Sequence, residues 1–568
     1  MSSKTGSRGG GVLIVIVILV AVALASPYYL GRQAERAYTD YLRQLDGMES
    51  VEVRDMSYRR GWLGASARYE LILQGRLRAV VEELLPLDPV SGEPLRVEVR
   101  DAIRHGPLAA GVSLASVEGY SRIDGWLVEG LLDAGGQPLE QGYDARVGFD
   151  RVVRGHWHPA SIELVSGPML SDADWDARYS VEHAGGAFSY DLRRGEYQGS
   201  MRVAHMRLED PTGNLVSEGS QSDVLARFGP GGLRALRVDT HEPLTTLEET
   251  VKDSVFTTRI EDQRTRMELG FDDAGGLNSL ALHYGLERID SETVFHTVSA
   301  TGMALGLDAE RHGPHAWFGG VEFSANALTL VSSDAVSPDM EASGLRSLLR
   351  LEPVNHDTLR LRTGFSADTL QLDLLEEPAR VDYQLSVSEL RRSGYEELWR
   401  LLYELLDGIQ LEEPALAPML SVAAGQAAMD MVGDRPRFQA DPVRLEVGDA
   451  SGEMALTLRV QPLALMMMGP QGLLQPGNEL DLRADVGGAL LEKLLRVQLR
   501  QEFEAAGVTP SDEDLEAMAQ QSVAEQLQPL LMQGLLVQDG DRYRMELHLD
   551  EGRLLLNGEP ADWLLQQF

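Results

Sequence analysis

Apolar residues occupy every second position in many short runs of this chain, with charged or polar residues between them. A period of two places the apolar side chains on one face of a β-strand. Strands of a buried parallel sheet would instead be apolar throughout, so the pattern predicts antiparallel sheets with one covered face. The runs are Val51 and Val53; Tyr69, Leu71 and Leu73; Leu95, Val97 and Val99; Met267, Leu269 and Phe271; Leu280, Leu282, Tyr284 and Leu286; Leu370, Leu372 and Leu374; Val381, Tyr383, Leu385 and Val387; Tyr543, Met545, Leu547 and Leu549; and Leu554 and Leu556.

Short connections rich in Gly, Asp and Asn separate many of these runs. Residues 272–276 read Asp-Asp-Ala-Gly-Gly, and residues 448–452 read Gly-Asp-Ala-Ser-Gly. Such segments favour tight turns, so neighbouring strands are expected to form hairpins. Between Gly31 and Leu45 the spacing changes to three and four residues, which predicts an amphipathic helix over residues 31–47.

Helical spacing returns in the C-terminal third of the sequence. One predicted helix ends near Gly408, and a second covers about residues 490–506. A third begins at Ser511, where Asp514 three residues later completes a helix N-terminus. The predicted fold class is therefore α+β, predominantly β, with extended antiparallel sheets and a helical layer in the C-terminal third.

The N-terminal segment predicts a single membrane anchor. No charged residue lies between Arg8 and Arg32, and residues 12–25 are rich in Val, Ile, Leu and Ala. A helix needs about 20 residues to cross a hydrocarbon core of about 30 Å, so the segment is long enough. Lys4 and Arg8 form a short basic tip that is expected to stay in the cytoplasm, with the rest of the chain translocated. The expected location is a bacterial inner membrane, with the body in the periplasm.

An alternative interpretation of this segment is a cleaved signal peptide. Ala23-Leu24-Ala25 matches the small-residue pattern of a cleavage site, and cleavage after Ala25 would release a soluble periplasmic protein. The body is exported in either case. The expected organisation is a cytoplasmic tip and anchor (1–30), a helical stalk (31–47), a β-rich region (48–387) and an α+β region (388–568).

Charge and cysteine content exclude several classes of partner and site. The chain of 568 residues has 88 acidic and 51 basic side chains, a formal net charge of −37. Such a surface repels phosphate backbones, so nucleic-acid binding is not expected. Cysteine is absent, which excludes disulfides, thiolate catalysis and Cys-ligated metals. The length predicts at least two packed units or one long sheet.

Three segments resemble the YdgA-like family of uncharacterised bacterial inner-membrane proteins. They are residues 51–66, which contain Arg60-Gly61-Trp62, then residues 103–108, which contain His105-Gly106-Pro107, and residues 552–558. The resemblance implies one domain of unknown function over nearly the whole exported chain, and it implies no catalytic residues. The family-motif positions, for which a structural role is favoured, are Tyr58, Gly61, Trp62, His105, Gly106, Pro107, Asn557 and Gly558. An anchored, repetitive antiparallel sheet is also similar to the AsmA-like envelope proteins, and this fold analogy suggests a groove for lipid.

Several local patterns have both a structural and a functional interpretation. His105-Gly106-Pro107 and His312-Gly313-Pro314 could pair two imidazoles, but Gly-Pro alone accounts for a turn. His156 and His158 lie on one face of a strand with no third ligand nearby, so a metal site is not favoured. Arg60-Gly61-Trp62 is expected to form a turn with its indole packed in the core.

Two further patterns are expected to be structural. Met466-Met467-Met468 could suggest a copper site, but adjacent side chains point in different directions, which favours flexible apolar filling. Glu376-Glu377 and Glu412-Glu413 resemble paired catalytic carboxylates, yet most acids in so acidic a chain are solvated. The sequence contains no G-x-S-x-G, Walker or H-E-x-x-H motif.

These observations predict a non-enzymatic envelope protein without a cofactor. An apolar sheet face is expected to receive a lipid, a lipoprotein or a second copy of the chain, which would make a homodimer. The alternative is an envelope hydrolase whose catalytic residues are dispersed in sequence. A long apolar trough supports the first hypothesis, and a closed pocket with a base, a nucleophile and an oxyanion donor supports the second.

Overall fold

The chain forms two compact units, residues 1–278 and 279–568. This boundary falls inside the β-rich region predicted for residues 48–387. The structure, a computed structural model, describes residues 29–36, 38–43, 45–46, 51–73, 96–105, 113–124, 132–133, 139–166, 178–210, 212–229, 232–251, 254–293, 296–332, 339–372, 375–410, 416–505, 508, 510–550, 552–561 and 563–564.

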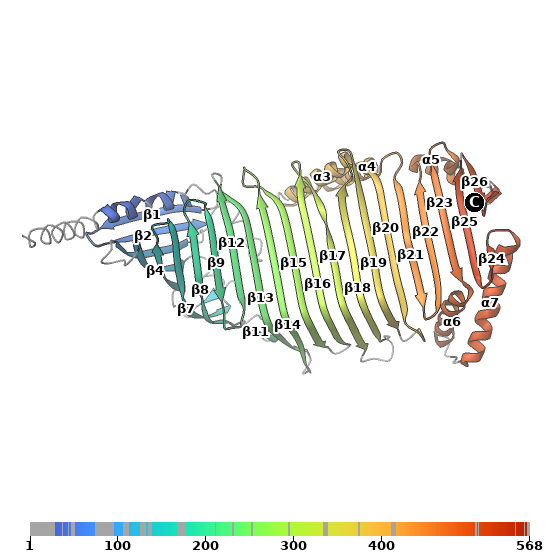
Figure 1. The fold of residues 1–568 in the computed structure, drawn as a ribbon, viewed down its shortest axis with the longest axis horizontal. Coiled ribbons are helices and arrows are strands. Elements are labelled where there is room, and N and C mark those ends of the chain that lie inside the picture. The colour runs from blue at the N-terminus through green and yellow to red at the C-terminus, as the bar shows by residue number, and fades with distance from the viewer. Residues whose placement is uncertain are drawn as a thin grey trace, which may run out of the picture. The chain divides into compact units, whose positions relative to one another are not determined.

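The first unit contains an N-terminal helix followed by antiparallel strands (Figure 1). We call the helical residues 29–36, 38–43 and 45–46 the N-terminal helix. The strands are β1 (Val51–Arg60), β2 (Gly64–Leu73), β3 (Arg96–His105), β4 (Ala115–Asp124), β5 (Leu132–Asp133), β6 (Leu139–Val147), β7 (Val152–Ser166), β8 (Arg178–Asp191), β9 (Glu196–Arg202), β10 (His205–Asp210), β11 (Gly213–Glu218), β12 (Gln221–Gly229), β13 (Gly232–Val251) and β14 (Ser254–Phe271).

Neighbouring strands of the first unit pair largely in sequence order. β1, β2, β3, β4, β6, β7 and β8 form a continuous antiparallel series. β9 and β10 then pair with different parts of β8, and β12 and β11 pair in the same way with β13. Short strands laid end to end therefore widen the sheet to the 20-residue β13 and the 18-residue β14.

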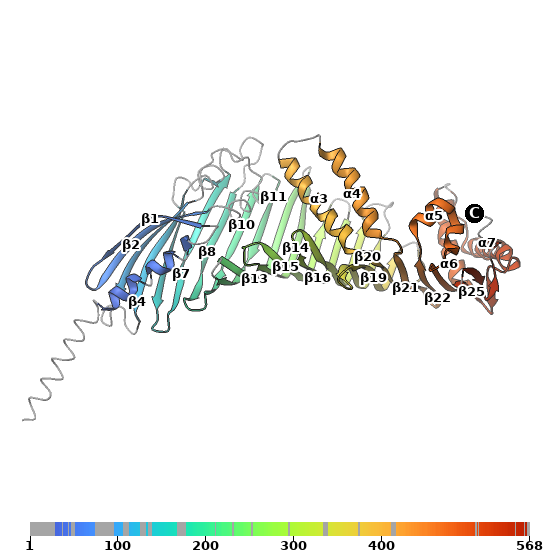
Figure 2. The ribbon, with the colours of Figure 1, turned by 90° about the horizontal axis from the view of Figure 1, so that it is seen from above.

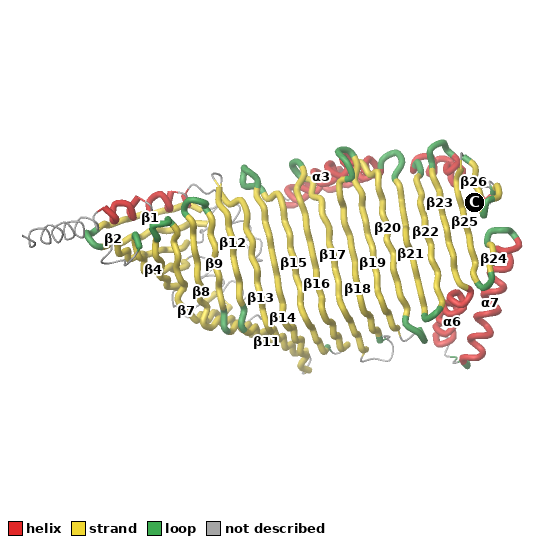
Figure 3. The backbone as a smooth tube through the Cα atoms, viewed as in Figure 1, coloured by secondary structure: helices red, strands yellow, loops and turns green. Residues whose placement is uncertain are grey.

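The second unit is a wide antiparallel meander with helices inserted between late strands (Figure 3). Its strands are β15 (Leu277–Glu292), β16 (His296–His312), β17 (Ala316–Ser332), β18 (Met340–Pro353), β19 (Thr358–Leu372), β20 (Ala379–Arg391), β21 (Arg437–Val447), β22 (Ala450–Arg459), β23 (Glu479–Gly487), β24 (Val537–Asp539), β25 (Arg542–Asp550), β26 (Arg553–Leu556) and β27 (Glu559–Pro560). The helices are α3 (Arg392–Gln410), α4 (Leu416–Val432), α5 (Pro462–Met468), the 3-10 helix η2 (Gly469–Leu474), α6 (Gly488–Ala505) and α7 (Asp512–Met532).

The predicted class, predominantly β with antiparallel sheets and C-terminal helices, is confirmed. The helices predicted to end near Gly408, to cover residues 490–506 and to begin at Ser511 correspond to α3, α6 and α7. The hydroxyl of Ser511 accepts a hydrogen bond from the backbone N–H of Asp514, as its cap position requires. The helix α4 was not predicted, because its small Ala residues lie on several sides and leave no apolar period in the sequence.

The predicted anchor, residues 1–30, lies almost entirely outside the described residues. In the part of the chain that the structure describes, no helix combines the length and the apolar character needed to cross a membrane. The amphipathic helix predicted for residues 31–47 is present, and its apolar side is buried on the sheet of the first unit. The stalk prediction therefore identified the helix, but the helix packs against the sheet.

Candidate functional site

One face of the second unit carries long rows of apolar residues. Directly paired residues of neighbouring strands lie side by side on the same face, so the register defines each row. None of the residues in the rows is charged. The rows are Leu280, Ala309, Gly319, Leu351, Leu361, Val387, Phe438, Leu458 and Leu480; Leu282, Leu307, Val321, Leu349, Thr363, Leu385, Ala440, Leu456, Leu482, Leu547 and Leu556; and Tyr284, Leu305, Phe323, Ser347, Phe365, Tyr383, Val443, Met454, Ala484 and Met545.

Part of this apolar face is open to solvent. Leu349 on β18 is 52% exposed, and the other large apolar residues of the patch are 36% to 40% exposed. Because strands lie about 4.8 Å apart, the distance from β16 to β22 is about 30 Å. We call this patch the apolar strip; its residues are Leu305, Val321, Leu349, Leu385, Phe438 and Met454.

The opposite face of the same strands is polar. Asp308, Gly320, Arg350, Arg362 and Ser386 form one paired row there. Ion pairs link strands on this face. Arg350 of β18 reaches across Gly320 of β17 to Asp308 of β16 at 2.5 Å, and Arg444 of β21 pairs with Glu453 of the neighbouring β22 at 3.0 Å. Since charged pairs satisfy this face in water, the apolar face is the side that requires a cover.

Among the described residues, the helices of the second unit pack on the margins of the apolar face. Tyr395 and Trp399 of α3 and Met431 of α4 pack against the buried Leu359 and Leu390 near one end of the strands. At other margins, Leu490 of α6 packs on a second buried cluster, and Leu473 and Leu474 of η2 pack on a third. Figure 2 shows α3, α4, α5 and α6 on the same side of the sheet. The apolar strip lies between these helical margins.

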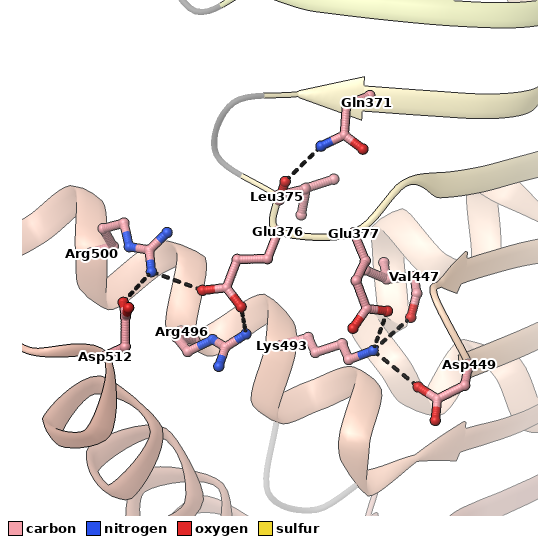
Figure 4. Close-up of polar contacts among 10 residues, drawn as sticks. All are labelled: Gln371, Leu375, Glu376, Glu377, Val447, Asp449, Lys493, Arg496, Arg500 and Asp512. Carbon is pink, nitrogen blue, oxygen red and sulfur yellow. Dashed lines mark hydrogen bonds and ion pairs between the residues drawn. The ribbon is translucent and has the colours of Figure 1, made fainter.

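A small, shallow cleft lies beside α6. Its basic side chains are Lys493, Arg496 and Arg500, three and four residues apart, so all three point from one side of the helix (Figure 4). Leu375, Val447 and Val497 line its apolar part. Leu375 and Val447 also pack in the buried cluster with Leu490, so the cleft adjoins the apolar face.

Carboxylates of two turns and of the first residue of α7 contact these basic side chains. The Nζ of Lys493 lies 2.8 Å from Glu377 and 3.0 Å from Asp449, and it also donates to the carbonyl of Val447. These hydrogen bonds outweigh burial, which alone would lower the pKa of Lys493, so that pKa is raised. Glu376 accepts from Arg496 through Oε2 and from Arg500 through Oε1. Arg500 also pairs with Asp512 at 2.9 Å.

The N-terminal helix covers the apolar face of the early strands of the first unit. Leu42 of this helix packs on Tyr69 and Val99, and all three residues are buried. A carboxylate lies under the helix, since Asp101 is 4% exposed and accepts hydrogen bonds from the hydroxyls of Tyr38 and Tyr143. Burial raises the pKa of Asp101, although the two tyrosine hydrogen bonds lower it in part.

Glycines permit this close packing. A Cβ on Gly119 would overlap the Asp101 carboxylate, and a Cβ on Gly31 would overlap the ring of His105. The His105 ring is fully buried under the N-terminal helix. This motif residue therefore positions the helix, whereas Gly106 and Pro107 lie outside the described residues.

The motif Arg60-Gly61-Trp62 forms the turn between β1 and β2, where the backbone N–H of Gly61 donates to the carbonyl of Gly64. The prediction that its indole packs in the core is wrong, because Trp62 is 55% exposed. The adjacent motif residue Tyr58 packs on Tyr38 with a ring separation of 5.6 Å, and burial raises the pKa of its hydroxyl to about 12.

Asn557 and Gly558 form the turn between β26 and β27, and both have positive φ angles. The Asn557 side chain accepts from the backbone N–H of Glu546 at 2.9 Å and donates to the carbonyl of Gly534 at 2.9 Å. This single side chain links β25 to the segment after α7. The structural role favoured for these two positions agrees with this geometry.

The remaining sequence candidates do not converge. Gly313 lies in the β16–β17 turn with a φ of 78°, in agreement with the turn interpretation of His312-Gly313-Pro314. His158 lies 3.2 Å from Asp144. No group of three His, Asp or Glu side chains among the described residues is placed to hold a metal ion.

The run of three methionines and the two Glu-Glu pairs differ in outcome. Met467 and Met468 follow one another at the end of α5 and are exposed, so the prediction that they fill apolar space is wrong; the Met466 side chain lies outside the described residues. Glu376 and Glu377 are partly exposed and paired with bases, while Glu412 and Glu413 lie outside the described residues. Lys493, Arg496 and Arg500 were not among the predicted site residues, although they recur at helical spacing in the sequence.

Comparison with known proteins identifies a family. The family model described as a bacterial protein of unknown function, DUF945, matches residues 11–234 and 250–562. The chain belongs to this family. The expectation that one domain of unknown function covers nearly the whole chain is thereby confirmed. No curated protein and no solved structure matches the chain.

Proposed function

We propose that this DUF945 protein, a YdgA-like envelope protein, binds the acyl chains of lipids on its apolar strip without catalysing a reaction. The observation that supports this proposal is the set of uncharged rows, whose central residues remain exposed between helical margins. Such a patch on a folded surface indicates a binding surface. Each methylene group buried there contributes up to about 0.8 kcal/mol, so a long acyl chain supplies ample driving force.

The chemistry of the strip favours an acyl chain over a protein partner. Specific protein interfaces carry about one hydrogen bond per 100–200 Å2 and a polar rim. The central rows offer few polar side chains, such as Ser347, Thr363 and Tyr383. An acyl chain needs no hydrogen bond along its length, so this surface suits it.

The helical margins disfavour a flat partner. Two packed sheets lie about 10 Å apart, and a helix has a diameter of about 10–12 Å. A sheet of a second copy would therefore meet α3 and α4 before it reached the strip (Figure 2). A flexible chain can lie between the helices, and we take a lipid as the occupant.

The proposed location completes this function. The apolar segment before residue 30 would hold the chain in a bacterial inner membrane, with the body in the periplasm. Lipid in that membrane would then be the nearest source of acyl chains. The uncharged strip supports binding alone, and this is why we propose a non-enzymatic role.

The test compares substitutions on the two faces of the sheet. Leu385 and Gln384 are neighbours on β20, both exposed, and they point to opposite faces. The full chain is purified in a non-ionic detergent, and co-purifying lipids are counted by native mass spectrometry. The Leu349→Lys/Leu385→Lys variant should lose most bound lipid, whereas Gln384→Lys should retain it.

The possible outcomes distinguish lipid binding on the strip from a second copy of the chain and from a hydrolase. Equal lipid in the wild-type protein and the strip variant would refute the proposal. Loss of a dimer in the strip variant, with no lipid on the wild type, would identify a second copy as the occupant. Lipid-independent hydrolysis of an envelope substrate that the strip variant retains would favour the hydrolase hypothesis.

A further inference from the structure

The cleft beside α6 has features of an anion site that a carboxylate of the chain occupies. Glu376 contacts Arg496 with one oxygen and Arg500 with the other. Two guanidinium groups around one two-oxygen anion are an arrangement by which proteins hold phosphate. Glu376 lies in the connection between β19 and β20, and not in a strand.

The basic side chains of the cleft are much less exposed than two of their acidic partners. The side chains of Lys493, Arg496 and Arg500 are only 19% to 23% exposed. Two of their acidic partners, Asp449 and Asp512, are 94% and 83% exposed, so water and salt screen those charges strongly. The inner part of the cleft is therefore more basic than a count of its charges indicates.

The surroundings of the cleft favour an amphiphile over a free anion. Leu375 and Val447 belong both to the cleft and to the buried cluster below Leu490. From this cluster, Leu445 continues along β21 to Val443, which belongs to the uncharged rows. A ligand with a phosphate in the cleft could therefore place its apolar part along the sheet without meeting a charged side chain in those rows.

We propose that this cleft binds the phosphate of an anionic lipid and that Glu376 occupies the same position when no lipid is bound. The inference rests on the proposed function, because the strip receives the acyl chains of the same molecule. Arg496 and Arg500 hold the phosphate oxygens, and Lys493 supplies the third positive charge. The net charge of −37 opposes anionic lipids elsewhere on the surface, so this local group of bases is needed.

The experiment uses two lipids with identical acyl chains. The full chain in non-ionic detergent is offered equal amounts of dioleoylphosphatidic acid and dioleoylglycerol, and bound lipids are counted by native mass spectrometry. The ratio of the two should fall at least tenfold in Arg496→Gln/Arg500→Gln, because charge-assisted hydrogen bonds are lost. The ratio should rise several-fold in Glu376→Gln, where the competing carboxylate is removed.

Controls separate the possible failures. Arg444 pairs with Glu453 on the polar face, so Arg444→Gln should leave the ratio unchanged. An unchanged ratio in both cleft variants would overturn this inference and leave acyl-chain binding intact. Failure of the wild type to bind either lipid would overturn the proposed function itself. If inorganic phosphate binds the Leu349→Lys/Leu385→Lys variant as tightly as the wild type binds phosphatidic acid, the cleft is a site for a free anion.

Discussion

The two units solve the same problem of an apolar sheet face in different ways. In the first unit the N-terminal helix lies on the strands, and Leu42, Tyr69 and Val99 are buried together. In the second unit the helices cover the margins of the face, and residues such as Leu349 remain exposed. The part of the first face under the N-terminal helix is covered by the chain itself, whereas the apolar strip of the second unit remains exposed.

The polar groups on the two faces differ accordingly. The first unit places Asp101 under its helix, and Tyr38 and Tyr143 hold the carboxylate from two sides. Such a buried group is tolerated because hydrogen bonds satisfy it, and it fixes the helix to one register. The uncharged rows of the second unit have no such group, which suits an occupant that can slide.

The largest expected effect tests the covered face. Leu42→Ala should lower the free energy of unfolding by about 2–5 kcal/mol, because it leaves a cavity under the N-terminal helix. Urea unfolding of the full chain in non-ionic detergent measures the change. Arg43→Ala, at an exposed position of the same helix, is the control and should change stability by less than about 0.5 kcal/mol. If Leu42→Ala leaves the free energy of unfolding unchanged, the helix does not stay on the sheet in solution.

A second prediction concerns the buried carboxylate. Burial, opposed in part by the tyrosine hydrogen bonds, raises the pKa of Asp101 above its usual 3.8, so the folded protein holds this proton more tightly than the unfolded chain. Protonation of Asp101 therefore adds to the free energy of unfolding below pH 3.8. This contribution is lost as the pH rises through the pKa that Asp101 has in the folded protein. A tenfold difference in proton affinity between the folded and unfolded states corresponds to about 1.4 kcal/mol of stability.

The measurement compares the wild type with Asp101→Asn by urea unfolding at several pH values. Asn accepts a hydrogen bond but does not ionise, so the stability of the wild type relative to this variant should decrease with pH above 3.8. A difference that stays constant from pH 4 to pH 8 would show that the carboxylate is solvated. The N-terminal helix would then not seal the first face.

Much of the fold could be predicted from local sequence. Period-two runs and Gly-rich turns identified the antiparallel strands, and Ser511 with Asp514 marked the start of α7. Whether a face is covered could not be predicted, because alternation shows only that one side is apolar. Trp62 is an example: its indole was expected in the core, but it is 55% exposed because the local sequence does not show whether another segment packs on this turn.

The cleft was harder to predict for a different reason. Lys493, Arg496 and Arg500 are recognisable as one side of a helix, but Glu376 lies 120 residues from Arg496. Only the pairing of β20, β21 and β22 with the helix across them brings these charges together. Long-range register is set by the whole sheet and leaves no signal in a short window of sequence.

The smallest expected effect tests the open face. Leu349→Ala removes the same atoms as Leu42→Ala, but from a side chain that is already 52% exposed, so it creates little cavity. In lipid-free protein the free energy of unfolding should fall by less than about 1 kcal/mol. When lipid is present, the same substitution should reduce the stabilisation that lipid confers, because contacts with the acyl chain are lost. A loss in lipid-free protein as large as that of Leu42→Ala would show that the strip is covered by the chain itself.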